Sequence, residues 1–187
     1  PYLEEPLFLQ TGEKRRAELM LEVKNISKTF NPGTVNEKQA LCGLSLTLAD
    51  GDVVTVIGGN GAGKSTLLNA IAGTWQVDEG KIIIDGMDVT RLSEHKRAAF
   101  LGRVFQDPMN GTAATMGIEE NLALALRRGH RRTLKQGIAN SERKLYRDLL
   151  AKLNLGLENR LTSKVGLLSG GQRQALTLLM ATLEKPK

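Results

Sequence analysis

Gly58-Gly59-Asn60-Gly61-Ala62-Gly63-Lys64-Ser65-Thr66 matches the phosphate-loop pattern G-x-x-x-x-G-K-[ST]. Its glycines allow backbone N–H groups to converge on phosphate oxygens, because no Cβ atoms stand in the way. Lys64 adds a mobile cation for the outer phosphates, and the Ser65 hydroxyl adds a ligand for Mg²⁺. We therefore predict a nucleoside triphosphate and Mg²⁺ site, formed by Gly58, Asn60, Gly61, Ala62, Gly63, Lys64, Ser65 and Thr66.

The segments on either side of this loop support the same interpretation. Residues 53–57 form a short continuous apolar run, which is typical of a strand buried on both faces. Residues 64–72 carry apolar side chains at helical spacing, and Gly73 follows as a candidate C-cap. Strand, loop and helix together predict an α/β fold with a P-loop NTPase core, in which helices flank a mixed sheet.

Further strands and helices are predicted around this core. Alternation over residues 21–26 indicates an edge strand, residues 43–48, 81–84 and 101–105 indicate three more, and residues 93–100 indicate a helix. These segments enlarge the predicted α/β core.

The middle of the chain has a different character. Helical patterns over residues 118–126 and 141–155 predict an inserted all-helical subdomain at about residues 108–175. Residues 1–19 have many charges and no clean period, and they precede Met20. We expect an N-terminal extension at 1–19, either native or an upstream appendage, and one main domain over 20–187.

Composition narrows the class of protein only slightly. With 41% apolar and 25% charged residues, 187 residues suit one ordinary globular domain, and the 4% aromatic share predicts an aliphatic core. The net charge of +6 suits nucleic acid, an anionic membrane surface or a phosphate ligand. Cys42 is the single cysteine and is expected to be buried and inert. No apolar run reaches a bilayer-spanning length and no signal peptide is apparent, so, if a membrane is involved, we expect another chain to span it.

A second motif, Leu168-Ser169-Gly170-Gly171-Gln172, begins just before an apolar helical run. Ser169 is a good N-cap, and the glycines bare the backbone at a helix N-terminus that suits an anion. Ser169 lies 105 positions after Lys64 (169 − 64). The chain therefore offers two helix N-termini suited to phosphate.

With this second motif, the sequence resembles the ATP-binding-cassette (ABC) family from about Met20 onward. The resemblance implies head-to-tail dimers, in which Ser169, Gly170, Gly171 and Gln172 of one copy close over ATP held by the phosphate loop of the other. It also implies that Gln106 reaches the metal and the attacking water as the glutamine of the Q-loop, and that Phe30 stacks on adenine.

The resemblance also implies motifs that this sequence does not contain. In the family, a strand ending in Asp and Glu follows the signature helix, and a switch histidine comes later still. The chain ends at Lys187 before any of these, so we expect it to bind ATP without hydrolysing it, whereas the full-length protein would be an ATPase. His95 and His130 precede the signature and are expected to be surface residues.

The function implied is that of the ATP-binding subunit of an importer for a small organic solute. Its expected partners are a second copy, separate transmembrane permease subunits and an extracytoplasmic solute-binding protein, at the cytoplasmic face of the membrane. The alternative is a soluble ABC ATPase that acts on ribosomes or DNA. The basic stretch at 127–132 with Lys135 fits a solvated loop better than a nucleic-acid or lipid contact, because it contains no aromatic residue, and no specific nucleic acid is expected.

Overall fold

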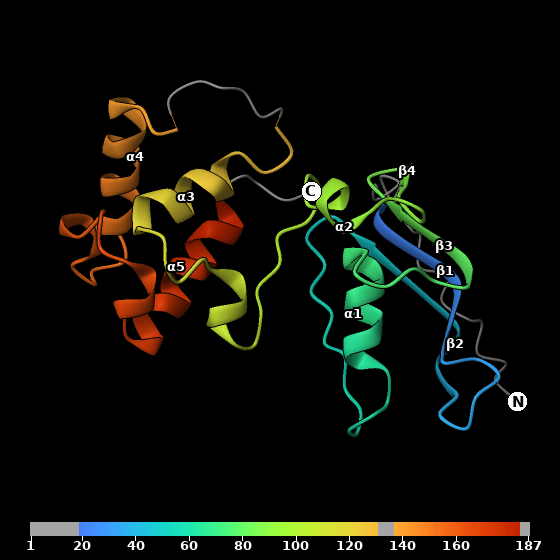
Figure 1. Ribbon diagram of the computed structural model, residues 1–187. Helices are drawn as coiled ribbons and strands as arrows, with labels where there is room; N and C mark the ends of the chain where they lie inside the picture. The colour runs from blue at the N-terminus through green and yellow to red at the C-terminus, as the bar shows by residue number, and fades with distance from the viewer. Residues whose placement is uncertain (1–18, 131–136, 184–187) are drawn as a thin grey trace, which may run out of the picture.

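The computed structural model describes residues 19–130 and 137–183 (Figure 1). Its strands are β1 (Leu19–Phe30), β2 (Lys38–Ala49), β3 (Glu79–Ile84) and β4 (Met87–Asp88). Its α-helices are α1 (Lys64–Ala72), α2 (Glu94–Arg97), α3 (Ile118–Leu126), α4 (Asn140–Ala151) and α5 (Gly170–Thr182). Short 3₁₀ turns are η1 (Pro108–Gly111), η2 (Leu157–Asn159) and η3 (Val165–Leu167).

The strands form a four-stranded antiparallel sheet in the order β2-β1-β3-β4. β1 pairs with β2 on one side and with β3 on the other, so the prediction of an edge strand at 21–26 was wrong. Alternating hydrophobicity reports that one face of a strand is buried, and it carries no information about how many neighbours the strand has. That buried face carries Val23 and Ile26, which pack beneath α1.

Two segments predicted as strands are not strands in this structure. Residues 53–57 are extended without ladder pairing, and the side chains of Val53 and Ile57 are 94% and 89% exposed. Residues 101–105 also lack strand pairing. A strand requires a neighbour to satisfy its backbone hydrogen bonds, and within residues 19–130 and 137–183 no strand lies alongside either segment. The prediction that residues 53–57 are buried on both faces was therefore wrong.

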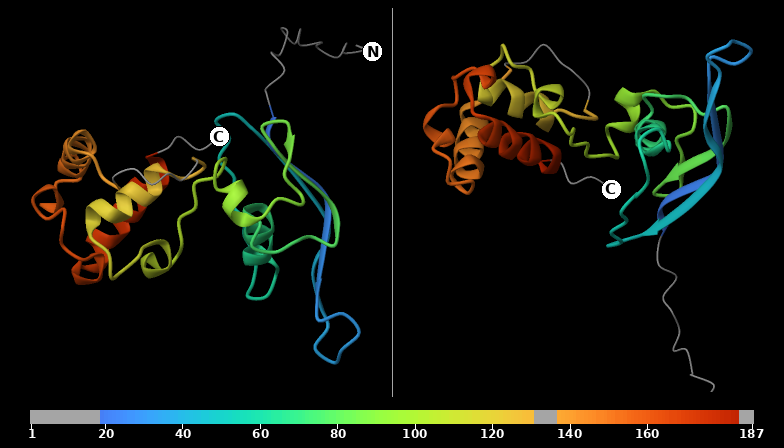
Figure 2. Two further views of the ribbon diagram at one scale, coloured as in Figure 1. Left: turned by 45° about the horizontal axis from the view of Figure 1, so that its top comes forward. Right: turned by 90° about the horizontal axis from the view of Figure 1, so that it is seen from below.

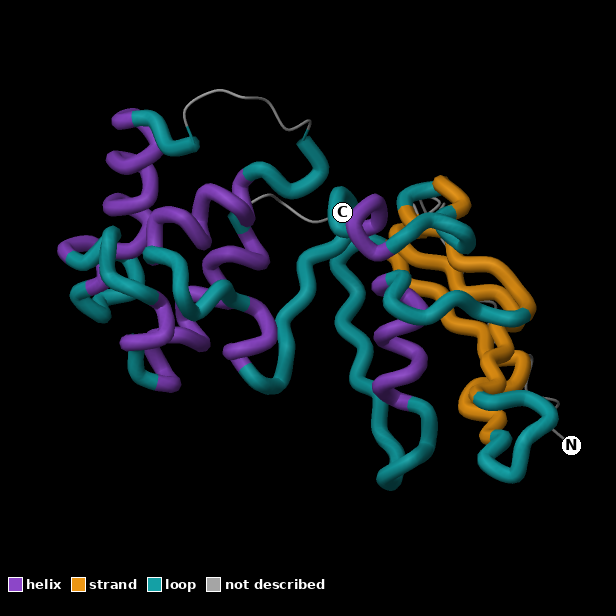
Figure 3. The backbone as a smooth tube through the Cα atoms, in the orientation of Figure 1, coloured by secondary structure: helices purple, strands orange, loops and turns teal. Residues whose placement is uncertain are grey.

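The described part of the chain has two apolar cores. One joins the sheet to α1 and to the segments on either side of α2, and it is almost entirely aliphatic, as the composition predicts. The other joins α3, α4 and α5 and includes one aromatic side chain, that of Tyr146. Figure 2 shows the sheet with α1 on one side of the molecule and α3 to α5 on the other, and Figure 3 shows the same separation by element type. The division into a core and a subdomain at about 108–175 stays a prediction.

The helices agree better with the sequence. α1 and α3 have the predicted bounds, and Gly73 caps α1 with φ 85°, its N–H donating to the carbonyl of Ala70. α4 ends earlier than expected, at Ala151, and Asn154 soon after adopts a φ of 53° that a helix cannot continue. Within the described ranges no helix combines the length and the hydropathy that a bilayer crossing requires.

Cys42 is exposed, so the prediction of a buried thiol was wrong. It follows Leu41 on β2, and Leu41 points into the core. Because successive side chains of a strand face opposite sides, the burial of Leu41 turns Cys42 toward solvent.

Candidate functional site

The phosphate loop forms a tight turn that packs against β2. Gly61 and Gly63 have φ values of 84° and 87°, a region that side chains with a Cβ rarely adopt. A Cβ on Gly63 would also collide with the carbonyl oxygen of Ala40. Glycine is therefore required at position 63 for both reasons, and the turn delivers the chain into α1 at Lys64.

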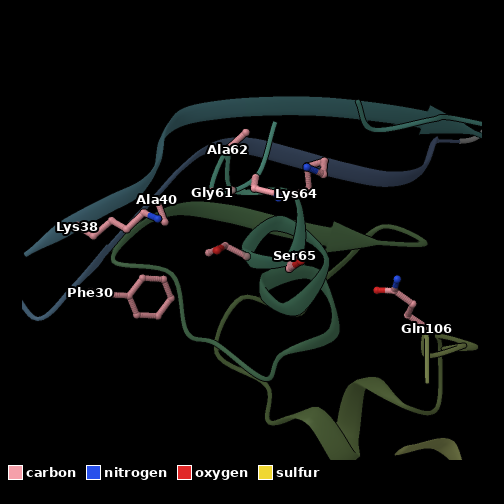
Figure 4. Close-up of a pocket in the computed structure, with 11 residues that line it drawn as sticks. Phe30, Lys38, Ala40, Gly61, Ala62, Lys64, Ser65 and Gln106 are labelled. Carbon is pink, nitrogen blue, oxygen red and sulfur yellow. The ribbon is translucent and has the colours of Figure 1, made fainter. Parts of the chain in front are cut away.

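A pocket of about 400 Å³ opens beside this loop (Figure 4). Its walls come from the end of β1, the start of β2, the phosphate loop with the first turn of α1, and the segment before η1. The lining residues are Phe30, Lys38, Ala40, Asn60, Gly61, Ala62, Gly63, Lys64, Ser65, Thr66 and Gln106. Folding thus brings together the predicted loop residues 60–66, Phe30 and Gln106, which are far apart in the sequence.

The donors of this pocket suit an anion. The first N–H groups of α1 have no intrahelical acceptor, and the positive end of the helix dipole lies there. The Lys64 ammonium donates to the carbonyls of Gly58 and Gly59 at 2.6 and 2.7 Å. Gly58, which was predicted to belong to the site, does not line the pocket and instead contacts the Lys64 side chain. The described lining contains Lys38 and Lys64 and no carboxylate. Triphosphate charge therefore fits this pocket, which the Ser65 hydroxyl, a group that can bind Mg²⁺, also lines.

Phe30 is held in place by an aromatic neighbour and an ion pair. The Phe30 and Trp75 rings meet edge to face with centroids 5.4 Å apart. The Lys28 ammonium lies 5.7 Å from the Phe30 ring and pairs with Asp78 at 2.7 Å. Asp78 also accepts from the Thr29 N–H at 2.6 Å, and these bonds, the one from Lys28 first, lower the pKa of the Asp78 carboxyl. The end of β1 is thereby fixed to the segment after α1.

Trp75 was not identified from the sequence. One signal could have drawn attention to it: Trp75 is the only tryptophan of the chain, and it lies two positions after Gly73, the C-cap of the phosphate-loop helix. Nothing in that local pattern indicates Phe30 as its partner, since the two residues meet only through the fold.

Gln106 lines the pocket on the side opposite Phe30 (Figure 4). The following residue, Asp107, caps η1 by accepting from the Met109 N–H at 2.9 Å. The Arg173 guanidinium contacts the sulfur of Met109 and donates to the carbonyl oxygens of Gly166 and Leu168, both at 3.1 Å. Arg173 thus links the Gln106 segment to the start of α5, a connection that sequence reasoning missed.

The signature residues form the N-terminus of α5. The Ser169 hydroxyl accepts from the Gln172 N–H at 3.3 Å, and the Gln172 side-chain oxygen accepts from the Ser169 N–H at 3.1 Å. This capping box confirms Ser169 as the N-cap. Cβ atoms on Gly170 and Gly171 would meet open space. None of these four residues lines the pocket beside Lys64, so one chain does not bring its own signature to its own phosphate loop.

The described part of the basic stretch makes contacts with neighbouring helices. The Arg127 guanidinium pairs with Glu142 at 2.9 Å, and Arg128 donates to the carbonyl of Ala181 at 3.4 Å. These contacts join the end of α3 to α4 and α5. Arg131, Arg132 and Lys135 lie outside the described residues.

Comparison with known proteins identifies the family. The family described as ABC transporter matches residues 41–187, well over half of the chain. The chain therefore belongs to the ABC transporter family and is an ATP-binding domain of that family.

Individual relatives agree with this assignment. The tyrosine transport ATP-binding protein of Clostridioides difficile (strain R20291) is 43% identical over 173 residues, an alignment that covers 90% of this chain and 66% of the relative. The spermidine/putrescine import ATP-binding protein PotA of Haemophilus ducreyi (strain 35000HP / ATCC 700724) is 35% identical over 175 residues, which cover 94% of this chain and 43% of PotA. The chain thus spans less than two thirds of these relatives.

A solved structure confirms the fold. The dimeric ATP-binding cassette MJ0796, in a post-hydrolysis state bound to ADP and phosphate, superposes with a TM-score of 0.73 at 29% identity. The match covers 89% of this chain and 71% of that cassette. The α/β cassette fold predicted from the two motifs is therefore correct, although residues 53–57 and 101–105 do not form strands here.

Proposed function

We propose that this chain binds ATP with Mg²⁺ and is the ATP-binding part of an importer for a small organic solute. The observation that carries the proposal is the single pocket shared by Phe30, the phosphate loop and Gln106. An aromatic face, a nest of backbone donors with a lysine, and a polar amide are the groups that a base, a triphosphate and a metal-bound water require.

Each group has its own task in this proposal. Phe30 stacks on adenine, and the amides of residues 60–66 with Lys64 hold the β- and γ-phosphates. Bound Mg²⁺ would offset phosphate charge, held by Ser65 and reached by Gln106. Thr66 adds a hydroxyl in the first turn of α1.

A second copy completes the site. Ser169, Gly170 and Gly171 are exposed and Gln172 is partly exposed at a helix N-terminus, where a phosphate would be favoured, yet all four lie outside the pocket of their own chain. We propose that they close over ATP bound by the partner in a head-to-tail homodimer. The dimeric state of the similar cassette MJ0796 supports this arrangement.

Hydrolysis needs a group that the described pocket lacks. The lining has no Asp, Glu or His side chain that could polarise the attacking water. We therefore propose that the 187-residue chain binds ATP without turnover, and that the full-length protein supplies the carboxylates for hydrolysis. Neither His95 nor His130 lines the pocket.

The proposed partners follow from the transport role. They are transmembrane permease subunits, which the segment around Gln106 would contact, and an extracytoplasmic solute-binding protein, with the ATP-binding domains at the cytoplasmic face of the membrane. The names of the relatives, tyrosine transport and spermidine/putrescine import, favour a small organic solute over a ribosome or DNA as the target of the ATPase.

Lys64→Ala tests the ATP site. We expect the variant to bind ATP about tenfold more weakly or worse, since a charge-assisted contact with phosphate contributes about 1.5 to 3 kcal/mol. Equilibrium dialysis with labelled ATP measures the affinity, and circular dichroism verifies folding. Lys152→Ala, which removes an exposed lysine at the end of α4, is the control. Equal affinity of Lys64→Ala and Lys152→Ala would contradict the proposed site.

A further inference from the structure

Lys38 places a second cation at the nucleotide pocket through the register of the sheet. It is the first residue of β2 and pairs across the ladder with Phe30, the last residue of β1. Residues paired in this way have neighbouring Cβ atoms, so the ammonium and the aromatic ring enter the pocket from one edge of the sheet.

The Lys38 side chain extends over the phosphate loop. Its Nζ lies 3.4 Å from the position that a Cβ on Gly61 would occupy. Figure 4 shows the Lys38 side chain reaching from the side of Phe30 toward Gly61. The ammonium therefore lies between the aromatic residue and the loop.

Lys38 also differs from the neighbouring lysines in its bonding. The Lys28 ammonium is paired with Asp78, and the Lys64 ammonium is bonded to two loop carbonyls. Among residues 19–130 and 137–183, Lys38 has no hydrogen-bond or ion-pair partner, and the described lining offers no carboxylate to it. A lysine directed into an anion pocket without an acidic partner is available to a ligand.

We propose that Lys38 binds the α-phosphate of the nucleotide, an inference that rests on the proposed ATP site. A nucleotide with its base on Phe30 and its terminal phosphates at Lys64 and Ser65 has its α-phosphate between them, where the Lys38 ammonium lies. Because ATP and ADP share that phosphate, Lys38 strengthens the binding of both and does not discriminate between them. The residue thereby helps to retain ADP when the γ-phosphate is absent.

The test compares Lys38→Met, which keeps the aliphatic stem, with Lys38→Arg, which keeps the charge. We expect Lys38→Met to weaken ATP and ADP binding by the same factor, about three- to tenfold, as for one charge-assisted contact of an exposed residue. Lys38→Arg should retain most of the affinity. Lys152→Met changes the net charge equally outside the pocket and should bind both nucleotides normally.

2′-Deoxy-ATP separates a phosphate contact from a ribose contact. If Lys38 binds phosphate, Lys38→Met weakens ATP and 2′-deoxy-ATP equally. The proposal is overturned if only ATP is weakened, which indicates the 2′-hydroxyl, if ADP is unaffected, or if Lys38→Met binds all ligands like the wild type. Normal binding by Lys38→Met together with loss in Lys64→Ala rejects this inference alone, whereas ATP binding unchanged in both variants rejects the proposed site as well.

Discussion

At the scale of single residues, the proposed base site depends on the Phe30 ring. Phe30 presents its ring there, and Trp75 holds that ring through an edge-to-face contact. Because the chain has one tryptophan, its emission reports on this contact directly. The residue that would bind the base is therefore next to a natural spectroscopic probe.

Phe30→Ala tests the stacking. We expect ATP binding to weaken about fivefold or more, since base stacking contributes about 1 to 3 kcal/mol. Dialysis with labelled ATP measures the loss, and Phe30→Tyr should retain the affinity. In the wild type, ATP should also change the emission of Trp75. An unaltered emission and a normal affinity of Phe30→Ala would place the base elsewhere.

At the scale of elements, the phosphate-loop helix is anchored at its far end by a buried cation. The Arg97 side chain has 0% exposure, and its guanidinium donates to the carbonyls of Ala70 and Ile71 at 2.6 and 2.9 Å. It also donates to the carbonyls of Leu92 and Thr90. Burial lowers the pKa of Arg97, and the charge of Asp88 opposes that shift. α1 is thus fixed to the segment between β4 and α2.

Arg97→Met removes those donors while preserving the aliphatic stem. We expect the free energy of unfolding to fall by about 2 to 4 kcal/mol, because several buried carbonyls lose their partners. Urea denaturation followed by circular dichroism measures the change. Arg97→Lys should recover little of the lost stability, since one ammonium group cannot reach all the carbonyls that the guanidinium contacts. Arg91→Met, at an exposed position nearby, should be near neutral, and an equally mild Arg97→Met would refute the anchoring role.

At the scale of the whole molecule, the phosphate loop and the signature face different sites. The pocket lining includes Lys64 but none of the residues 169–172. In a two-fold dimer, each site would then take its loop from one chain and its signature from the other. A defect in the phosphate loop of one chain would then damage one of the two sites, and a defect in the signature of the same chain would damage the other.

Mixing two defective full-length proteins tests this arrangement. Lys64→Ala and Ser169→Arg should each lose ATPase activity, because each spoils both sites of its homodimer. A mixed dimer pairs the intact loop of one subunit with the intact signature of the other, so random mixing should restore at most about a quarter of the wild-type sites. ATPase assays on dimers verified by differential tagging measure the recovery. Absence of recovery in verified mixed dimers would reject the shared site.

The sequence alone determined those features that rest on local backbone chemistry. The phosphate loop, the bounds of α1, the C-cap at Gly73 and the N-cap at Ser169 all depend on hydrogen bonds within a few residues. Such bonds are specified by residue type and spacing, wherever the rest of the chain lies. The family assignment followed from two of these local motifs.

Only the tertiary structure decided which distant groups meet. The interior place of β1, the unpaired state of residues 53–57 and the outward side chain of Cys42 depend on strand neighbours that periodicity does not report. Trp75 reaches Phe30, and Lys38 reaches the phosphate loop, through the packing of α1 against the sheet. Contacts of this kind form only when segments that are distant in the sequence pack together, so local residue spacing does not predict them.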